Sequence, residues 1–255
     1  MYLLYVFIGL TVGILVGFMG IGGGVLLVPA LVYVLKMDQH MAQGTSLFLQ
    51  LPPLGLGALS VYWKKRQVDV KAGLTCALGF LMGGYFGSKI AIDTPSRNLH
   101  ELFGLFLVVA ATTLWWKPEF SISPIADTET NSLIRLLRIL LMSFGVGVAG
   151  GLFGVGGGVL LVPLLVVIFG FEQHRAQGTS LVALVPPTGL LAFLNYSAAA
   201  QVNWTVGLWL MPGVFFGGIG GSWLAEKLSS DVLRRVVAIL VLTMGVWEAS
   251  EVFRR

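Results

Sequence analysis

Two kinds of repeated phrase in this sequence combine residue types that can hold an anion without a charged side chain. GIGGGVLLVP occupies residues 20–29 and GVGGGVLLVP residues 154–163, while QHMAQGTSL occupies 39–47 and QHRAQGTSL 173–181. Glycines let a ligand approach the backbone, and helix N-termini attract anions through free N–H groups and a partial positive charge. Glutamine amides and hydroxyls add neutral donors. We therefore predict a substrate-binding site for a small anion made of Gly22, Gly23, Gly24, Gln43, Gly44, Thr45, Ser46, Gly156, Gly157, Gly158, Gln177, Gly178, Thr179 and Ser180.

A purely structural interpretation of these residues stays open. Small residues let helices pack closely in membranes, and a threonine or serine can cap a helix without binding a ligand. Spacing separates part of the set, because we expect packing glycines to recur every four residues. Glycines with that spacing are assigned to helix packing: Gly9, Gly13, Gly17, Gly79, Gly83, Gly87, Gly213, Gly217 and Gly221. The consecutive glycines 22–24 and 156–158 break this spacing, which favours a binding site.

A histidine precedes each GTS phrase at a matching position. The unperturbed pKa of histidine is about 6.5, so His40 and His174 could carry a proton that is coupled to transport. The alternative is an interfacial histidine that is hydrogen-bonded to the backbone. We expect the histidines to stand apart from carboxylates, and we expect no metal ion and no cofactor. Coupling to H⁺ or to Na⁺ is open, since nothing in the sequence selects one.

Composition identifies a membrane protein. Of the 255 residues, 56% are hydrophobic and only 11% are charged, whereas a soluble domain carries about 25% charged residues. Mean hydropathy is +0.87, and long apolar runs predict transmembrane helices that contact the lipid bilayer. The net charge of +4 comes from short basic loops, which fit lipid headgroups and not nucleic acid. We expect the first helix to be retained and not to be a signal peptide.

The sequence is duplicated with an offset of 134 residues. Besides the phrases above, the offset pairs the double prolines 52–53 and 186–187, and it pairs Tyr62 with Tyr196. We predict a first transmembrane repeat at 1–116, a polar linker at 117–134 and a second repeat at 135–255. The expected apolar segments are 2–19, 25–37, 46–63, 72–92 and 99–116 in the first repeat, and 136–153, 159–171, 180–196, 206–226 and 233–250 in the second.

Glycine and proline predict breaks in these helices. The GIGGG phrase should end one helix, with the next beginning near Val25. The segment 25–37 is too short to span a bilayer core of about 30 Å unaided. Thr45 or Ser46, and Thr179 or Ser180, are expected to cap the helices that follow. The chain is therefore predicted to be an all-α polytopic membrane protein with 8–10 transmembrane segments.

Charge predicts that the two repeats are inverted. The loop KKRQVDVK at 64–71 is basic, whereas its counterpart SAAAQVNWT at 197–205 has no charge. Basic loops stay in the cytoplasm, so equivalent loops of opposite character suggest opposite sides of the membrane. Transporters are often built from inverted repeats, with the site at the repeat interface.

The doubled phrases GxGGGxLLVP and HxAxGTSL resemble the sulfite exporter TauE/SafE family over nearly the whole chain. The resemblance implies a permease of the cytoplasmic (inner) membrane for small sulfur-containing anions such as sulfite or organosulfonates. Members have about eight helices, whereas the apolar segments here number ten.

These features bear on three classes of function. A secondary transporter working by alternating access accounts for the duplicated polar residues, with the anion held where the broken helix ends of the two repeats meet. A passive anion channel is the alternative, although a channel would need a continuous polar stripe, which is not evident in the sequence. An intramembrane enzyme is disfavoured: there is no HExxH motif, and the single cysteine, Cys76, has Leu210 as its counterpart. Substrate, coupling ion, flux direction and oligomeric state are not given by the sequence.

Overall fold

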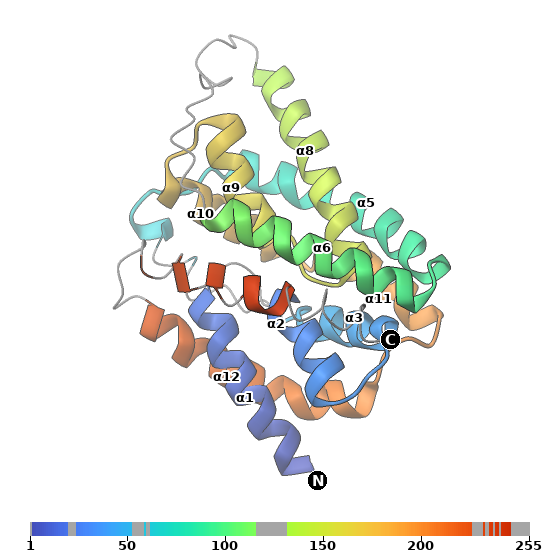
Figure 1. Ribbon diagram of the computed structural model, residues 1–255. Helices are drawn as coiled ribbons and strands as arrows, with labels where there is room; N and C mark the ends of the chain where they lie inside the picture. The colour runs from blue at the N-terminus through green and yellow to red at the C-terminus, as the bar shows by residue number, and fades with distance from the viewer. Residues whose placement is uncertain are drawn as a thin grey trace.

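A computed structural model describes residues 2–19, 24–52, 59, 62–115 and 132–225, together with 232, 235–236, 238–239 and 241–245. Every element within these ranges is helical (Figure 1). The elements are α1 (Tyr2–Met19), α2 (Gly24–Pro29), the π-helix η1 (Ala30–Val34), α3 (Gln39–Leu49), α5 (Val70–Asp93), α6 (Ser96–Trp115), α8 (Ser132–Phe153), α9 (Gly158–Phe169), α10 (Gln173–Leu184), α11 (Leu190–Ala198) and α12 (Trp204–Ala225). The all-α prediction is therefore confirmed for the part of the chain that the structure describes.

Helices α1 and α12 form one closely packed pair, although they come from different halves of the chain. Their backbones touch at glycines that recur every four residues, and the contacts advance in step along both helices: Gly9 on Leu210, Gly13 on Val214 and Gly17 on Gly218. The two helices consequently run parallel. A Cβ on any of these three glycines would overlap the backbone of the partner helix, so glycine is required for this distance of approach.

Helices α5 and α8 form the second pair, and it repeats the first with the halves exchanged. The register contacts are Gly79 on Leu140, Gly83 on Phe144 and Gly87 on Val148. In the first pair the corresponding contacts are Gly213 on Val6 and Gly217 on Leu10, which differ from these by 134 residues on both sides. Each half therefore gives its first long helix to the other half. The assignment of the regularly spaced glycines to packing is confirmed at these positions.

The outer faces of these helices are apolar. Five α5 side chains at four-residue spacing are half-exposed or more: Leu74, Leu78, Met82, Phe86 and Ile90. A soluble helix would place polar residues there, so this face suits lipid. Helices α5 and α8 are each long and apolar enough to cross a membrane, while residues 2–17, 24–34 and 158–169 form shorter apolar helices.

The predicted breaks lie close to where the glycines and prolines stand. Helix α2 begins at Gly24 and α9 at Gly158, in agreement with the helix start expected near Val25. Helix α10 ends at Leu184, and α11 begins after the Pro186–Pro187 pair. The predicted linker needs one correction, because residues 132–134 form the first turn of α8. Residues 117–131 lie outside the described part of the chain.

Candidate functional site

The GTS phrases lie inside helices and not at their N-termini. Helix α3 begins at Gln39, and Asp38 caps it by accepting a hydrogen bond from the His40 amide at 3.2 Å. Helix α10 begins at Gln173, directly after Glu172, whose side chain makes no capping hydrogen bond. The prediction that Thr45, Ser46, Thr179 or Ser180 caps these helices is therefore wrong. Each helix instead begins after an acidic residue that stands seven positions before the threonine. At α3 the Asp38 carboxylate is favoured next to the free N–H groups of the first turn.

The glutamines of the two phrases bind tyrosines of the opposite half. The Tyr196 hydroxyl donates to Gln43 Oε1 at 2.8 Å, and the Tyr62 hydroxyl donates to Gln177 Oε1 at 2.9 Å. Each residue differs from its counterpart by 134 positions. Both hydrogen bonds therefore connect the two repeats by the same geometry.

The threonines of the phrases hold a loop of the opposite half. Thr45 Oγ1 accepts a hydrogen bond from the backbone amide of Asn203 at 3.0 Å, and Thr179 Oγ1 accepts one from the backbone amide of Asp69 at 3.0 Å. Asn203 and Asp69 in turn accept, through their side chains, from the backbone amide three residues further on. They thereby begin α12 and α5, the two helices that carry the packing glycines. The threonine hydroxyls are engaged in assembling the repeats.

Glycine is required between the glutamine and the threonine because a loop segment of the opposite repeat passes close to the helix backbone there. A Cβ on Gly44 would overlap the carbonyl oxygen of Gln201, and a Cβ on Gly178 would overlap the carbonyl oxygen of Gln67. The QGT triplet is therefore an inter-repeat clamp: the glutamine and threonine bind on either side of a glycine that admits the partner backbone.

The two glycine-rich phrases approach each other in space. A Cβ on Gly24 would overlap the backbone of Val155. Ser46 Oγ donates to the Gly154 carbonyl at 2.9 Å, and Gln50 Nε2 donates to the same oxygen at 3.2 Å. The structure thus brings Gly24 and Ser46 to the second glycine phrase.

Two glycines of the turn at residues 154–157, here called the glycine turn, have a left-handed backbone conformation. Gly154 has φ of +68° and Gly156 has φ of +67°, a region that side chains with a Cβ rarely adopt. Gly157 precedes α9 as its N-cap and lies against the Phe80 ring. Gly22 and Gly23 lie outside the described residues, so their part in the predicted site is not seen.

One amide in this region has no hydrogen-bond partner. Gln43 is fully buried, and its Nε2 is unpaired although its Oε1 is bound to Tyr196. A Cβ on Gly154 would lie 2.7 Å from the Gln43 Cα, so the amide belongs to the residue that packs against the glycine turn. Leaving a buried donor unpaired costs about 1–3 kcal/mol. An unpaired donor in this position suits a ligand acceptor.

The buried polar side chains are all neutral among the described residues. They are Gln39, Gln43, Thr45, Ser46, Ser88, Ser143, Thr179, Ser180 and Thr188. Five of these belong to the predicted site. Within the same residues, no group of three or more His, Cys, Asp or Glu side chains is placed to hold a metal ion.

His40 is fixed in a polar network at the junction of α5 and α6. Its Nδ1 lies 2.7 Å from Ser96 Oγ and 3.4 Å from Asp38 Oδ2, and Ser96 Oγ donates to the same carboxylate oxygen at 2.9 Å. Its Nε2 lies 2.9 Å from the Ala91 carbonyl and 3.0 Å from the Thr94 carbonyl. The expectation that the histidines stand apart from carboxylates is wrong for His40. Proton coupling through His40 stays a prediction.

His174, the counterpart of His40, is exposed and lies beside the Tyr62 ring, with 6.5 Å between ring centroids. The two histidines should therefore differ in their contribution to stability. We expect His40→Ala to lower the free energy of unfolding by about 2 kcal/mol, because several partly buried hydrogen bonds are lost. His174→Ala should change it by less than about 0.5 kcal/mol, as is usual for a surface position. Thermal unfolding of the purified variants measures both, and equal losses would contradict the structural role of His40.

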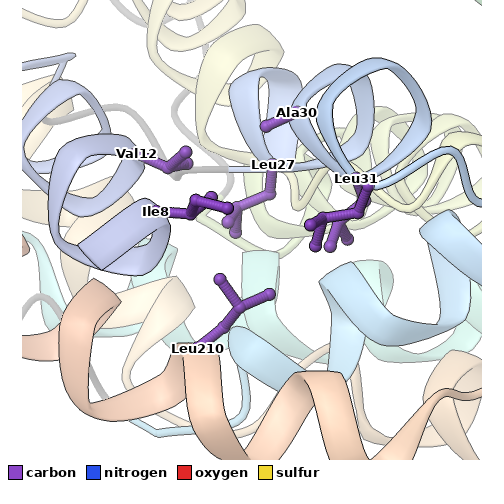
Figure 2. Close-up of a pocket in the computed structure, with 7 residues that line it drawn as sticks. Ile8, Val12, Leu27, Ala30, Leu31 and Leu210 are labelled. Carbon is purple, nitrogen blue, oxygen red and sulfur yellow. The ribbon is translucent and has the colours of Figure 1, made fainter. Parts of the chain in front are cut away.

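A small apolar pocket lies apart from these polar groups. Figure 2 shows it between α1, α2, η1 and α12, where Leu210 faces Ile8 and Leu27. The side chains that line it are Ile8, Val12, Leu27, Ala30, Leu31, Leu35 and Leu210. These side chains offer no hydrogen-bond donor, so the pocket is unsuited to an anion.

The residues that bind the QGT triplets were not predicted as part of the site: Tyr62, Tyr196, Asp69 and Asn203. The tyrosines were visible as a pair with the repeat offset, and this is the signal that could have found them. Asp69 and Asn203 share the same offset but differ in type, so the pair is hidden from a search for identical residues. The signal that identifies these contacts is a polar residue at equivalent positions of both repeats, whether or not the two residues are identical.

Two interleaved helical repeats, with apolar outer faces and polar contacts at their interface, indicate a membrane protein. Comparison with known proteins agrees: the chain belongs to the sulfite exporter TauE/SafE family, which it matches over residues 4–247. It is 27% identical to the probable membrane transporter protein YunE of Bacillus subtilis, with 96% of each chain covered. It is 31% identical to a probable membrane transporter protein of Xylella fastidiosa, with 94% of this chain and 91% of the relative covered. No solved structure matches. The protein is accordingly a membrane protein of a transporter family.

Proposed function

We propose that this protein is a multi-pass secondary transporter of the inner membrane that exports a small sulfur-containing anion, such as sulfite or an organosulfonate. The observation that carries the proposal is the unpaired Gln43 Nε2, which is buried beside the glycine turn at 154–157. A sulfur oxyanion presents acceptor oxygens only. A neutral amide donor satisfies such an oxygen without burying a cation, which would be costly within a membrane.

The same contacts divide the predicted site residues by role. In the proposal, Gln43 and the backbone N–H groups of the glycine turns contact the anion, because glycine lets it approach the backbone. Thr45, Thr179, Gly44 and Gly178 hold the repeats together, since their contacts are already made within the protein. The anion would lie at the start of α9, which begins at Gly158, and not at the start of α3, where the Asp38 carboxylate already accepts from the first turn.

The proposal includes inverted repeats and alternating access. Helix α1 rises from the N-terminus in Figure 1, whereas its counterpart α8 descends, and this supports opposite orientations in the membrane. The exchanged helix pairs support a two-fold relation between the halves. The basic loop at 64–71 and its uncharged counterpart at 197–205 then lie on opposite sides, with the basic loop in the cytoplasm.

Thermal stabilisation of the purified full chain in detergent tests the proposed substrate. The panel is sulfite, sulfate, thiosulfate, short organosulfonates and carboxylates, each with and without Na⁺ and at two pH values. A ligand present at a hundredfold excess over Kd stabilises the folded state by about 2.7 kcal/mol. We expect this for a sulfur oxyanion and expect its loss in Gln43→Leu.

Gln39→Leu is the matched control, because Gln39 is also buried with an unpaired Nε2 and lies one turn earlier on α3. It should keep the stabilisation by the anion. Silence from every sulfur anion, or equal loss in both variants, would contradict the proposed site. In vesicles, saturable flux with counterflow is expected, and linear flux would instead indicate a channel.

A further inference from the structure

The two tyrosine–glutamine hydrogen bonds connect the repeats at equivalent places but differ in how deeply their residues are buried. Tyr196 and Gln43 are fully buried, whereas Tyr62 and Gln177 are both half-buried. The sequence treats the two contacts alike, since all four residues obey the offset of 134. The four residues that form the two contacts therefore do not account for the difference in burial.

Further contacts strengthen the buried member of the pair. The Tyr196 hydroxyl lies 3.2 Å from the Gly151 carbonyl and 3.4 Å from the Leu152 carbonyl, in addition to its bond with Gln43. This single hydroxyl thus holds α11 against both α3 and the end of α8. Gly151 and Leu152 directly precede the glycine turn of the proposed site. Release of Tyr196 would free the turn on that side.

The half-buried member lies on the charged side of the molecule. Thr179, two residues after Gln177, accepts a hydrogen bond from the Asp69 backbone amide. The Asp69 carboxylate forms an ion pair with Arg175 at 2.9 Å. The equivalent loop near Tyr196 contains no charge. An anion that enters from the 64–71 side would meet basic residues, whereas Tyr196 is packed in an apolar cluster with Phe193 and Val202.

We propose that these two contacts are the two gates of the transport cycle, with the Tyr196–Gln43 gate shut in this structure and the Tyr62–Gln177 gate poised to open. The inference rests on the proposed transport function. Tyr62 and Tyr196 are then positioning residues, because they act by placing Gln177 and Gln43. Transporters built from two repeats alternate when equivalent contacts of the repeats open in turn, and breaking one contact shifts the population towards the state in which it is open.

The test measures labelling of a buried cysteine from each side of the membrane. Cys76 is the one cysteine of the chain, so Cys76→Ala gives a background for a Ser46→Cys reporter beside the glycine turn. An impermeant maleimide is applied to vesicles of either orientation. Cysteines introduced singly at Lys65 and Ala199 calibrate the side on which each loop lies.

We expect Tyr196→Phe to raise labelling of the reporter from the 197–205 side and to lower it from the 64–71 side. Tyr62→Phe should do the reverse. Each shift should be about three- to tenfold, as expected for the loss of one or two buried hydrogen bonds. Tyr5→Phe on α1 is the control and should leave both rates unchanged.

Opposite shifts are the signature of gates, since merely loosened packing raises labelling from both sides together. Changes in the same direction, or no change beyond that of Tyr5→Phe, would overturn the proposal. Labelling needs no substrate, so the outcome is independent of the proposed anion. Opposite shifts without sulfite binding would keep the gates and remove the substrate class, and sulfite binding without opposite shifts would do the converse. The thermal unfolding midpoint of each variant confirms that it is folded.

Discussion

Replacing Gly217 with leucine should prevent α12 from docking on α1. A Cβ at this position would overlap the Leu10 carbonyl and lie 2.8 Å from the Ile14 amide nitrogen. Both obstacles are helix backbone, which cannot rotate away as a side chain can. Overpacking a well-packed interior costs about 1–3 kcal/mol, and contact with backbone on two turns should reach the upper end. We expect Gly217→Leu to lose about 3 kcal/mol and to accumulate poorly in the membrane.

Gly220 on the same helix gives a matched control. A Cβ at Gly220 meets no atom within 4 Å, so Gly220→Leu adds the same side chain to the same helix in open space. We expect this variant to accumulate and elute from size-exclusion chromatography in detergent like the unmodified protein. Equal behaviour of the two variants would contradict the parallel α1–α12 packing and, by the repeat relation, the α5–α8 packing.

The glycine spacing was enough to predict where helices pack, and the reason is physical. Backbone contact between two helices needs a small residue at each turn, so a four-residue glycine period is a direct record of the interface. The spacing could not say which helix is the partner. That each half receives its packing partner from the other half depends on how the chain is threaded, which no local pattern encodes.

The start of α3 was wrongly predicted at the GTS phrase because the sequence contains two possible caps, seven residues apart. The prediction relied on Thr45, which precedes the apolar run, and overlooked Asp38, which stands directly before Gln39. The structure uses Asp38. Thr45 then points to Asn203 of the other repeat, a partner 158 positions away. A hydroxyl that looks like a local cap is in fact a long-range contact.

The polar character of the site was predicted more fully than its geometry. The neutral donors and the approach of Gly24 to the second glycine phrase follow from the doubled phrases and their offset of 134 residues. The tyrosines that bind Gln43 and Gln177 were missed as site residues because they are far from the phrases in sequence. The unequal burial of Tyr62 and Tyr196 could not be predicted at all, since identical residues at equivalent positions give identical expectations.

Gly154→Ala is expected to damage the proposed site through backbone strain and collision together. The residue has φ of +68°, where an L-residue loses roughly 1–2 kcal/mol. Its new Cβ would also lie 2.7 Å from the Gln43 Cα and 2.9 Å from the Gln43 carbonyl oxygen. The turn must then move away from α3 and break the hydrogen bond from Ser46 to the Gly154 carbonyl. We expect a loss of about 3 kcal/mol in unfolding free energy, from strain and overpacking together, and loss of anion flux in vesicles.

Gly156→Ala separates strain from collision, because Gly156 has nearly the same φ, +67°, but faces the flexible end of the Gln50 side chain. Shortening that side chain should relieve the collision, so Gly156→Ala with Gln50→Ala should regain part of the stability lost by Gly156→Ala alone. The matching rescue must fail at Gly154, where Gln43→Ala leaves the obstructing Cα and carbonyl in place. Thermal unfolding of the four variants measures this contrast. Recovery of Gly154→Ala by Gln43→Ala would mean that the turn does not lie against the α3 backbone, and the anion site proposed between them would have no foundation.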